Sequence, residues 1–128
     1  MVKQGRQLAA VMFTDMVGYT AMMQVNEEEA KKNRDRHRQV LEQRIQGNGG
    51  KILQYYGDGT LSAFDSAIQA VRAGLEIQVD LRKEPEIPVR IGLHIGDIVY
   101  EDGGIYGDAV NVASRIENIA SAGSVLFS

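Results

Sequence analysis

Two aspartates with glycines nearby are the residues of this sequence best suited to chemistry. Asp15 follows a short apolar run, and Asp58 stands between Gly57 and Gly59, where no bulky side chain keeps a large anionic ligand away. Carboxylates at such turns suit a pair of hard divalent cations, usually magnesium, shared with phosphate oxygens. Taken singly, Asp15 is better explained as a helix cap and Asp58 as an ordinary turn residue. A metal site is favoured only if the fold brings the two together.

The segment directly after Asp15 is suited to binding phosphate. Val17, Gly18, Tyr19 and Thr20 lead into a short predicted helix, and backbone amides at the start of a helix can bind the oxygens of a phosphate chain.

A second polar pair stands far along the chain, on a helix predicted over residues 108–120. Asn111 and Arg115 are four residues apart, hence on one face of that helix. Side by side they can donate several hydrogen bonds to a phosphoryl group in its transition state. A solvated polar face explains the pair equally well when it is taken alone.

Apolar patterning predicts the elements that must position these residues. The expected strands cover residues 8–13, 51–56, 60–64, 89–95, 98–100 and 125–127. A first long helix begins at the N-cap Asn26 and ends near residue 46. A second, capped by Asp65 or Ser66, ends near residue 82, and its apolar positions are Ile68, Val71, Leu75 and Val79.

This order of elements predicts an α+β fold of the ferredoxin-like (split βαβ) type, an antiparallel sheet with helices on one face. Its third strand lies beside the first, antiparallel to it, with right-handed crossovers. The end of the first strand and the turn between the second and third strands then share one sheet edge. Asp15 and Asp58 should therefore meet.

Composition narrows the class of protein. The chain has 128 residues, no cysteine, two histidines and a formal net charge of -3. We therefore expect one domain over 1–128, without disulfides or a thiolate metal site and without affinity for nucleic-acid polymers. No apolar run is long enough to span a membrane and the first residues lack an export signal, so we expect a cytoplasmic domain without membrane contact.

Four blocks of the sequence, taken together, resemble the catalytic domain of class III nucleotidyl cyclases. They are FTDMVGYT at 13–20, YGDG at 56–59, RIGLHIG at 90–96 and YGDAVNVASR at 106–115. The blocks occur in the family's order and span nearly the whole chain.

The resemblance implies a role for each candidate residue. Asp15, Asp58 and the backbone of Met16 would hold two divalent metal ions, Mg²⁺ or Mn²⁺, and residues 17–20 would bind the triphosphate. Asn111 would position the ribose, and Arg115 would stabilise charge on the α-phosphate. The product would be a 3′,5′-cyclic monophosphate for intracellular signalling. The family's sites are shared between protomers, which implies a head-to-tail homodimer.

Two positions that select the base in this family depart from its pattern here. Gln54 stands where adenylate cyclases usually have Lys and guanylate cyclases Glu, and Gly104 replaces the common Asp or Thr. An amide both donates and accepts, so Gln54 suits either purine. ATP is the expected substrate because the guanylate-type Glu is missing.

Other functions stay open at this point. The chain stops where the family usually continues into a further hairpin with a phosphate-binding Lys, so the domain is expected to be short at its C-terminus. The alternatives are a guanylate cyclase and a catalytically weak or inactive nucleotide-binding dimerisation module. A diguanylate cyclase ranks below them because its hallmark glycine and acidic motif is missing.

Overall fold

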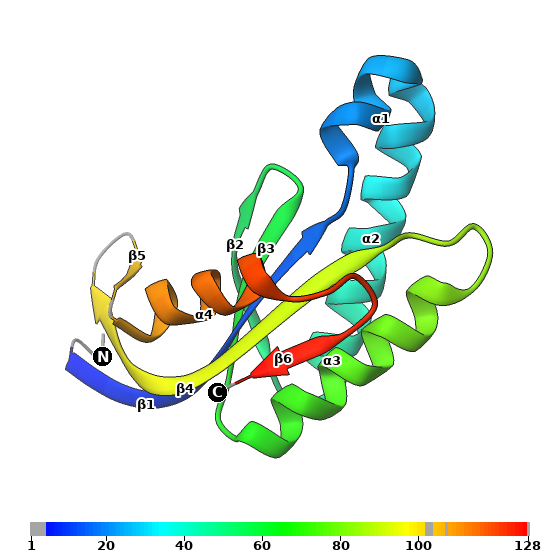
Figure 1. The fold of residues 1–128 in the computed structure, drawn as a ribbon. Coiled ribbons are helices and arrows are strands. Elements are labelled where there is room, and N and C mark those ends of the chain that lie inside the picture. The colour runs from blue at the N-terminus through cyan, green and yellow to red at the C-terminus, as the bar shows by residue number, and fades with distance from the viewer. Residues whose placement is uncertain (1–4, 102–103, 107, 128) are drawn as a thin grey trace.

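The fold is built on a β-sheet with β1 (Gly5–Met16) at its centre and with helices packed against it (Figure 1). The structure is a computed structural model, which describes the backbone of residues 5–101, 104–106 and 108–127 and the side chains of 8–99 and 108–127. The remaining strands are β2 (Lys51–Tyr56), β3 (Gly59–Phe64), β4 (Val89–Glu101), β5 (Gly104–Tyr106) and β6 (Val125–Phe127). The helices are α1 (Tyr19–Val25), α2 (Glu27–Gly47), α3 (Ala67–Arg82) and α4 (Asp108–Ile119).

The strand order confirms the predicted ferredoxin-like topology. The sheet runs β2-β3-β1-β4-β5, and β1 pairs antiparallel with both β3 and β4. At the other side of β4, β6 pairs in parallel with residues 91–93. The expected break between strands at 89–95 and 98–100 is wrong, because β4 continues through both and pairs with β1 along its length.

Local capping places the two long helices where the sequence predicts them. The side chain of Asn26 accepts a hydrogen bond from the Glu29 amide (3.1 Å) and begins α2. Ser66 accepts from the Gln69 amide (3.2 Å) and begins α3. Each bond satisfies a backbone donor that the first helical turn leaves without a partner, so both helix starts are determined locally.

The main core lies between one face of the sheet and the helices α2 and α3. Met12 and Met16 of β1 pack there with Leu41 and Ile45 of α2, Ile77 and Leu81 of α3, and Ile91 and Leu93 of β4. These two crossover helices share one face, as the topology predicts.

Helix α4 lies on the opposite face, so the expectation that all helices cover one face is wrong for this element. Ala109 and Ala113 of α4 pack with Val11 of β1 and Ile98 of β4, on the face away from α2 and α3. The cause is Gly92, where an added Cβ would lie 2.3 Å from the backbone nitrogen of Glu117. Because Gly92 carries no side chain, the backbone of α4 packs directly on β4 at this point.

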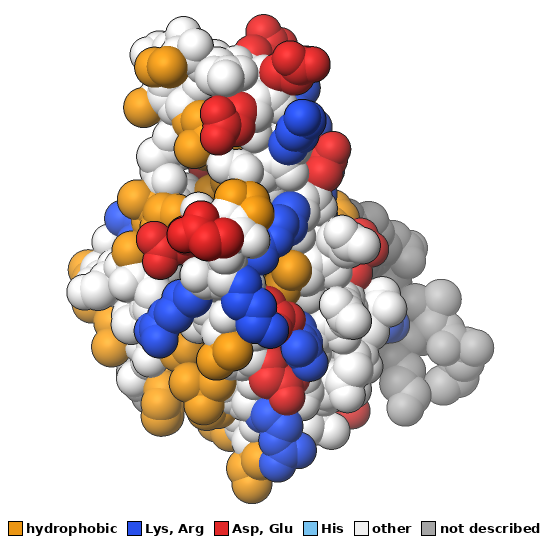
Figure 2. All heavy atoms as spheres, turned by 90° about the vertical axis from the view of Figure 1, so that its right-hand side faces the viewer, with side chains coloured by type: hydrophobic (Ala, Val, Ile, Leu, Met, Phe, Trp, Pro, Cys, Tyr) orange, Lys and Arg blue, Asp and Glu red, His pale blue; other side chains and the backbone are white. Residues whose placement is uncertain are grey.

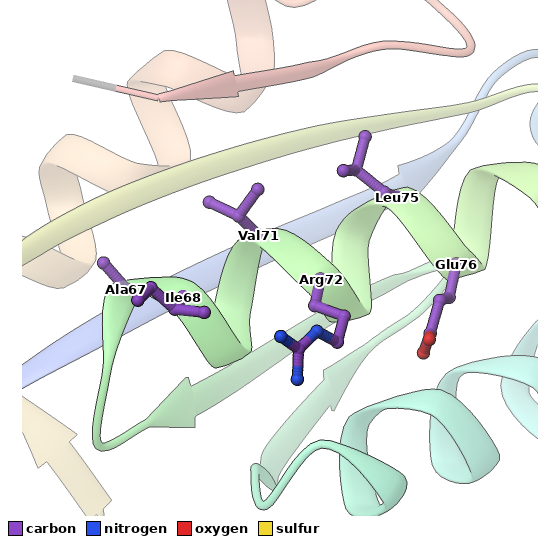
Figure 3. Close-up of a pocket in the computed structure, with 6 residues that line it drawn as sticks. All are labelled: Ala67, Ile68, Val71, Arg72, Leu75 and Glu76. Carbon is purple, nitrogen blue, oxygen red and sulfur yellow. The ribbon is translucent and has the colours of Figure 1, made fainter.

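The apolar stripe expected to bury α3 is mostly exposed instead. Ile68, Leu75 and Val79 are 70%, 55% and 56% exposed. Together with Val71 they follow the outer side of the helix. Ile68, Val71 and Leu75 line a shallow groove there with Arg72 and Glu76 (Figure 3). The buried side consists of Ala70, Ala73, Gly74, Ile77, Gln78 and Leu81. This side of α3 is buried because its small residues let the helix approach the sheet closely. A Cβ on Gly74 would lie 3.2 Å from the side chain of Val125.

This orientation of α3 predicts unequal losses of stability. Ile77→Ala should lower the free energy of unfolding by about 2–5 kcal/mol, because the side chain is fully buried and leaves a cavity. Leu75→Ala, from the exposed side, should change it by no more than about 0.5 kcal/mol. Urea unfolding of both variants beside the wild type measures the difference. A loss for Leu75→Ala as large as that for Ile77→Ala would mean that the apolar stripe of α3 is buried, contrary to this structure.

Acidic and basic side chains are interspersed on the side of the molecule shown in Figure 2. Two arginines of α2 connect that helix to the end of α3. Arg44 donates two hydrogen bonds to the Asp80 carboxylate (2.6 and 3.1 Å). Arg36 donates to the carbonyl oxygens of Asp80, Lys83 and Pro85. Among the helices that the structure describes, none is long and apolar enough to cross a bilayer.

Candidate active site

Asp15 and Asp58 meet at the sheet edge, which confirms the predicted convergence. Asp15 is the last residue but one of β1 and lies opposite Gly59 of β3. The Met16 amide donates a hydrogen bond to the Asp58 carbonyl (3.3 Å), which holds the turn between β2 and β3 against the end of β1. The Asp58 carboxyl group lies close enough to Asp15 to raise the pKa of Asp15.

The electrostatics of this edge favour a bound cation. The pKa of Asp15 is raised to about 7, chiefly by burial and further by repulsion from Asp58 and Glu117, while Arg90 opposes the rise. Burial also raises the pKa of Glu117. A carboxylate that is hard to ionise beside two others is stabilised by a divalent cation, which offsets their negative charge.

Arg90 and Glu117 are part of this cluster, and the sequence analysis missed both. Arg90 lies opposite Asp15 in the β1–β4 register, and Glu117 is on the buried side of α4, only 5% exposed. Nη2 of Arg90 is 3.7 Å from Asp15 Oδ2, and its Nε is 3.5 Å from Glu117 Oε2. The sequence offered one signal for Glu117: it stands four residues after Ala113 and eight after Ala109, on one side of the predicted helix, where a charged residue beside small apolar ones is unusual.

Glycine keeps the space beside the carboxylates open. A Cβ on Gly59 would lie 3.1 Å from the Thr14 carbonyl oxygen and 3.7 Å from Asp15 Oδ1. Gly57 has φ 56°, a left-handed conformation that glycine adopts without strain. A ligand can therefore approach the backbone of this turn.

The residues expected to bind triphosphate differ in availability. The Val17 amide donates to the Pro88 carbonyl (2.9 Å), so it is already used. Gly18, with φ 76°, precedes α1, and no side chain caps that helix. The amides that follow Gly18, including those of Tyr19 and Thr20, are the ones left for phosphate oxygens.

Asn111 and Arg115 are exposed and lie on the side of α4 turned away from the sheet. Glu117 and Ala113 mark the side that packs against β4. The helical repeat puts the two stripes on opposite sides of α4. A single chain therefore does not bring the Asn–Arg pair to the carboxylates.

The two positions expected to select the base lie on opposite edge strands, β2 and β5, of the sheet order β2-β3-β1-β4-β5. Gln54 is exposed on β2, and its side-chain oxygen accepts a hydrogen bond from the Tyr56 hydroxyl (3.2 Å). Gly104 begins β5 and pairs with Glu101. The order β2-β3-β1-β4-β5 separates the two within one chain.

The residues present fit divalent metal ions of the oxygen-binding kind. Asp15 and Asp58 supply hard carboxylate ligands at a partly desolvated edge, and the strand end at Met16 lies beside them. Within the described part of the chain, no group of three or more His, Cys, Asp or Glu is arranged to hold a metal by itself. Further ligands would then come from backbone, water or substrate oxygens, as is usual for magnesium.

Comparison with known proteins decides the family. The model of the adenylate and guanylate cyclase catalytic domain matches residues 1–128, the whole chain. The chain belongs to this family.

The relatives of this cyclase domain support the assignment. A putative adenylate cyclase 3 of Rhizobium meliloti is 37% identical over 96% of the chain, and the match covers 22% of that protein. An adenylate cyclase of Streptomyces coelicolor is 29% identical over 91% of the chain and 31% of its own length. The domain thus spans less than a third of these curated relatives.

Solved cyclase structures share the fold. The adenylate/guanylate cyclase/hydrolase of Silicibacter pomeroyi has 40% identity and a TM-score of 0.81, covering 97% of this chain and 76% of that one. The adenylyl cyclase CyaB of P. aeruginosa, 22% identical, reaches a TM-score of 0.91 over 99% and 79% of the two chains. The class III cyclase resemblance and the α+β fold expected from the sequence are both confirmed.

Proposed function

We propose that this cyclase domain converts ATP to 3′,5′-cyclic AMP and pyrophosphate at the interface of a head-to-tail homodimer. The observation that carries the proposal is the convergence of Asp15 and Asp58 at a crowded, partly buried edge, in a chain of the adenylate and guanylate cyclase family. In the reaction the ribose 3′-oxygen bonds to the α-phosphorus, the bond from that phosphorus to pyrophosphate breaks, and the 3′-hydroxyl gives up its proton.

Asp15, Asp58 and the Met16 backbone would hold two Mg²⁺ or Mn²⁺ ions. Such ions, when bound, lower the pKa of the attacking hydroxyl and neutralise the triphosphate. The chain's own contribution is to hold two carboxylates in one place through the Met16–Asp58 backbone hydrogen bond. The amides after Gly18 would orient the phosphate chain.

Asn111 and Arg115 would act on a nucleotide held by the partner subunit. Their exposure on the outer side of α4 leaves them free to reach across an interface. Arg115 would stabilise the charge that develops on the α-phosphate, and Asn111 would orient the ribose. Two such sites complete each other in a symmetric dimer.

ATP is proposed over GTP because Gln54 stands where the guanylate cyclases of this family have Glu. The Gln54 oxygen accepts from the Tyr56 hydroxyl (3.2 Å), and its amide NH₂ can donate to N1 of adenine. To the N1–H and the exocyclic amine of guanine, Gln54 offers one neutral oxygen in place of the two charged oxygens of Glu. Guanylate cyclase activity is the alternative that the substrate test must decide.

The test is a product assay by mass spectrometry with ATP and GTP in competition, under Mn²⁺ and then Mg²⁺, across protein concentrations. We expect cyclic AMP as the main product, with specific activity rising as the dimer forms. Cyclic GMP as the main product would overturn the base assignment alone. Nucleotide binding without any cyclic product would favour the inactive dimerisation module.

A further inference from the structure

Arg90 and Glu117 face the metal-binding edge from two different elements, and the mechanism above gives neither a role. Arg90 is the second residue of β4 and lies opposite Asp15, and Glu117 lies near the end of α4. The charged groups at this edge are thus Asp15 from β1, Asp58 from the β2–β3 turn, Arg90 and Glu117. Of these three carboxyl groups, Asp15 and Glu117 contact the guanidinium group of Arg90.

The guanidinium group of Arg90 is divided between two carboxylates. Its Nη2 is 3.7 Å from Asp15 Oδ2 and its Nε is 3.5 Å from Glu117 Oε2. Both distances are ion-pair contacts, longer than an ordinary hydrogen bond. Within the described residues, neither Arg90 Nε nor Glu117 Oε2 has a hydrogen-bond partner, although both atoms are buried.

Such a divided contact is unusual for buried charges, which normally make full hydrogen bonds. A shift of the guanidinium group toward Glu117 would complete the bond that both buried atoms lack. The same shift would withdraw positive charge from Asp15. The guanidinium group thus lies between two possible positions, one on Asp15 and one on Glu117.

We propose that Arg90 and Glu117 are positioning residues for the metal-binding carboxylate: Arg90 neutralises Asp15 while no cation is bound, and Glu117 takes Arg90 over when a divalent cation binds. The proposal rests on the metal role of Asp15 in the proposed function. It assigns Glu117 an effect on metal binding without making it a ligand, and it explains why a buried carboxylate stands at this place in α4.

Metal affinity should then move in opposite directions in the two single variants. Arg90→Gln removes the cation that competes for Asp15, so Mn²⁺ should bind about tenfold more tightly. Glu117→Gln removes the acceptor that withdraws Arg90, so Mn²⁺ should bind about tenfold more weakly. In the double variant there is no Arg90 for Glu117 to withdraw, so the affinity should stay as tight as in Arg90→Gln. A return to the wild-type affinity would mean that the two charges act independently, and the positioning role would be wrong.

The measurement is a titration of Mn²⁺ against each protein, followed by the EPR signal of free Mn²⁺ without nucleotide, alongside thermal unfolding of the same samples. Arg44→Gln is the matched control, since it removes one positive charge from a remote ion pair with Asp80. It should lower stability and leave the Mn²⁺ affinity unchanged. If Arg90→Gln does not fold, Glu117→Gln and the double variant still test the proposal. The double variant must bind Mn²⁺ more tightly than Glu117→Gln does.

Two kinds of failure are distinguishable. If the wild type binds Mn²⁺ in a manner that Asp15→Asn abolishes, but both single variants shift affinity the same way or not at all, the pair only supports the fold and the positioning role is wrong. If the wild type and Asp15→Asn bind Mn²⁺ equally or not at all, the metal site fails, and this proposal fails with it.

Discussion

Asp15→Asn should abolish formation of cyclic nucleotide and at the same time stabilise the metal-free protein. The loss of turnover should be at least about a thousandfold, because the substitution removes one of the two carboxylate ligands. The gain in stability has a separate cause, namely that burial and the neighbouring carboxylates Asp58 and Glu117 make the negative charge of Asp15 unfavourable.

The sign of the pH dependence follows from the raised pKa of Asp15, about 7 against an ordinary 3.8. The folded protein binds this proton more tightly than the unfolded chain, so the favourable contribution is complete below pH 3.8 and is lost as pH rises to about 7. Asparagine resembles the protonated carboxyl at every pH. At pH 8 in EDTA, the variant should be more stable by about 1–2 kcal/mol, allowing for the partial exposure of Asp15.

Thermal unfolding in EDTA at pH 5 and pH 8, with a cyclase assay on the same samples, tests both effects. The difference in melting temperature between the variant and the wild type should be larger at pH 8. Asp35→Asn is the control, since its side chain is 74% exposed, and it should alter neither quantity. A variant that is less stable than the wild type at pH 8 would contradict the electrostatic account.

Mixing two inactive variants should restore activity if the site is shared between protomers. Asp15→Asn damages the metal half of a site, and Arg115→Ala the half carried by α4. Each variant alone should lose at least about a hundredfold in activity. Random exchange of subunits in a 1:1 mixture places one intact site in half of the dimers, which predicts recovery of about a quarter of wild-type activity.

A mixture of Asp15→Asn with Asp58→Asn controls for exchange itself. Both changes lie in the same half of the site, so no dimer in that mixture has an intact site and no recovery is expected. Recovery in neither mixture, with subunit exchange shown independently, would mean that Asp15 and Arg115 of one chain do not serve complementary sites.

Local signals determined much of this protein in advance. The caps at Asn26 and Ser66, which depend on neighbours three residues away, place the starts of α2 and α3. The order of strands and helices predicts which strands pair, because the connections leave few other arrangements. The meeting of Asp15 and Asp58 follows from that pairing alone, and so could be predicted without any side-chain contact.

Tertiary packing decided what periodicity could not. Helix α3 has two faces that could be buried, and the one with Ala73 and Gly74 was chosen because small residues allow close approach to the sheet. Helix α4 crosses to the other face because Gly92 leaves room for its backbone. That choice brings Glu117 to Arg90 across 27 residues of sequence. Such a contact depends on where two elements dock, which no local pattern specifies.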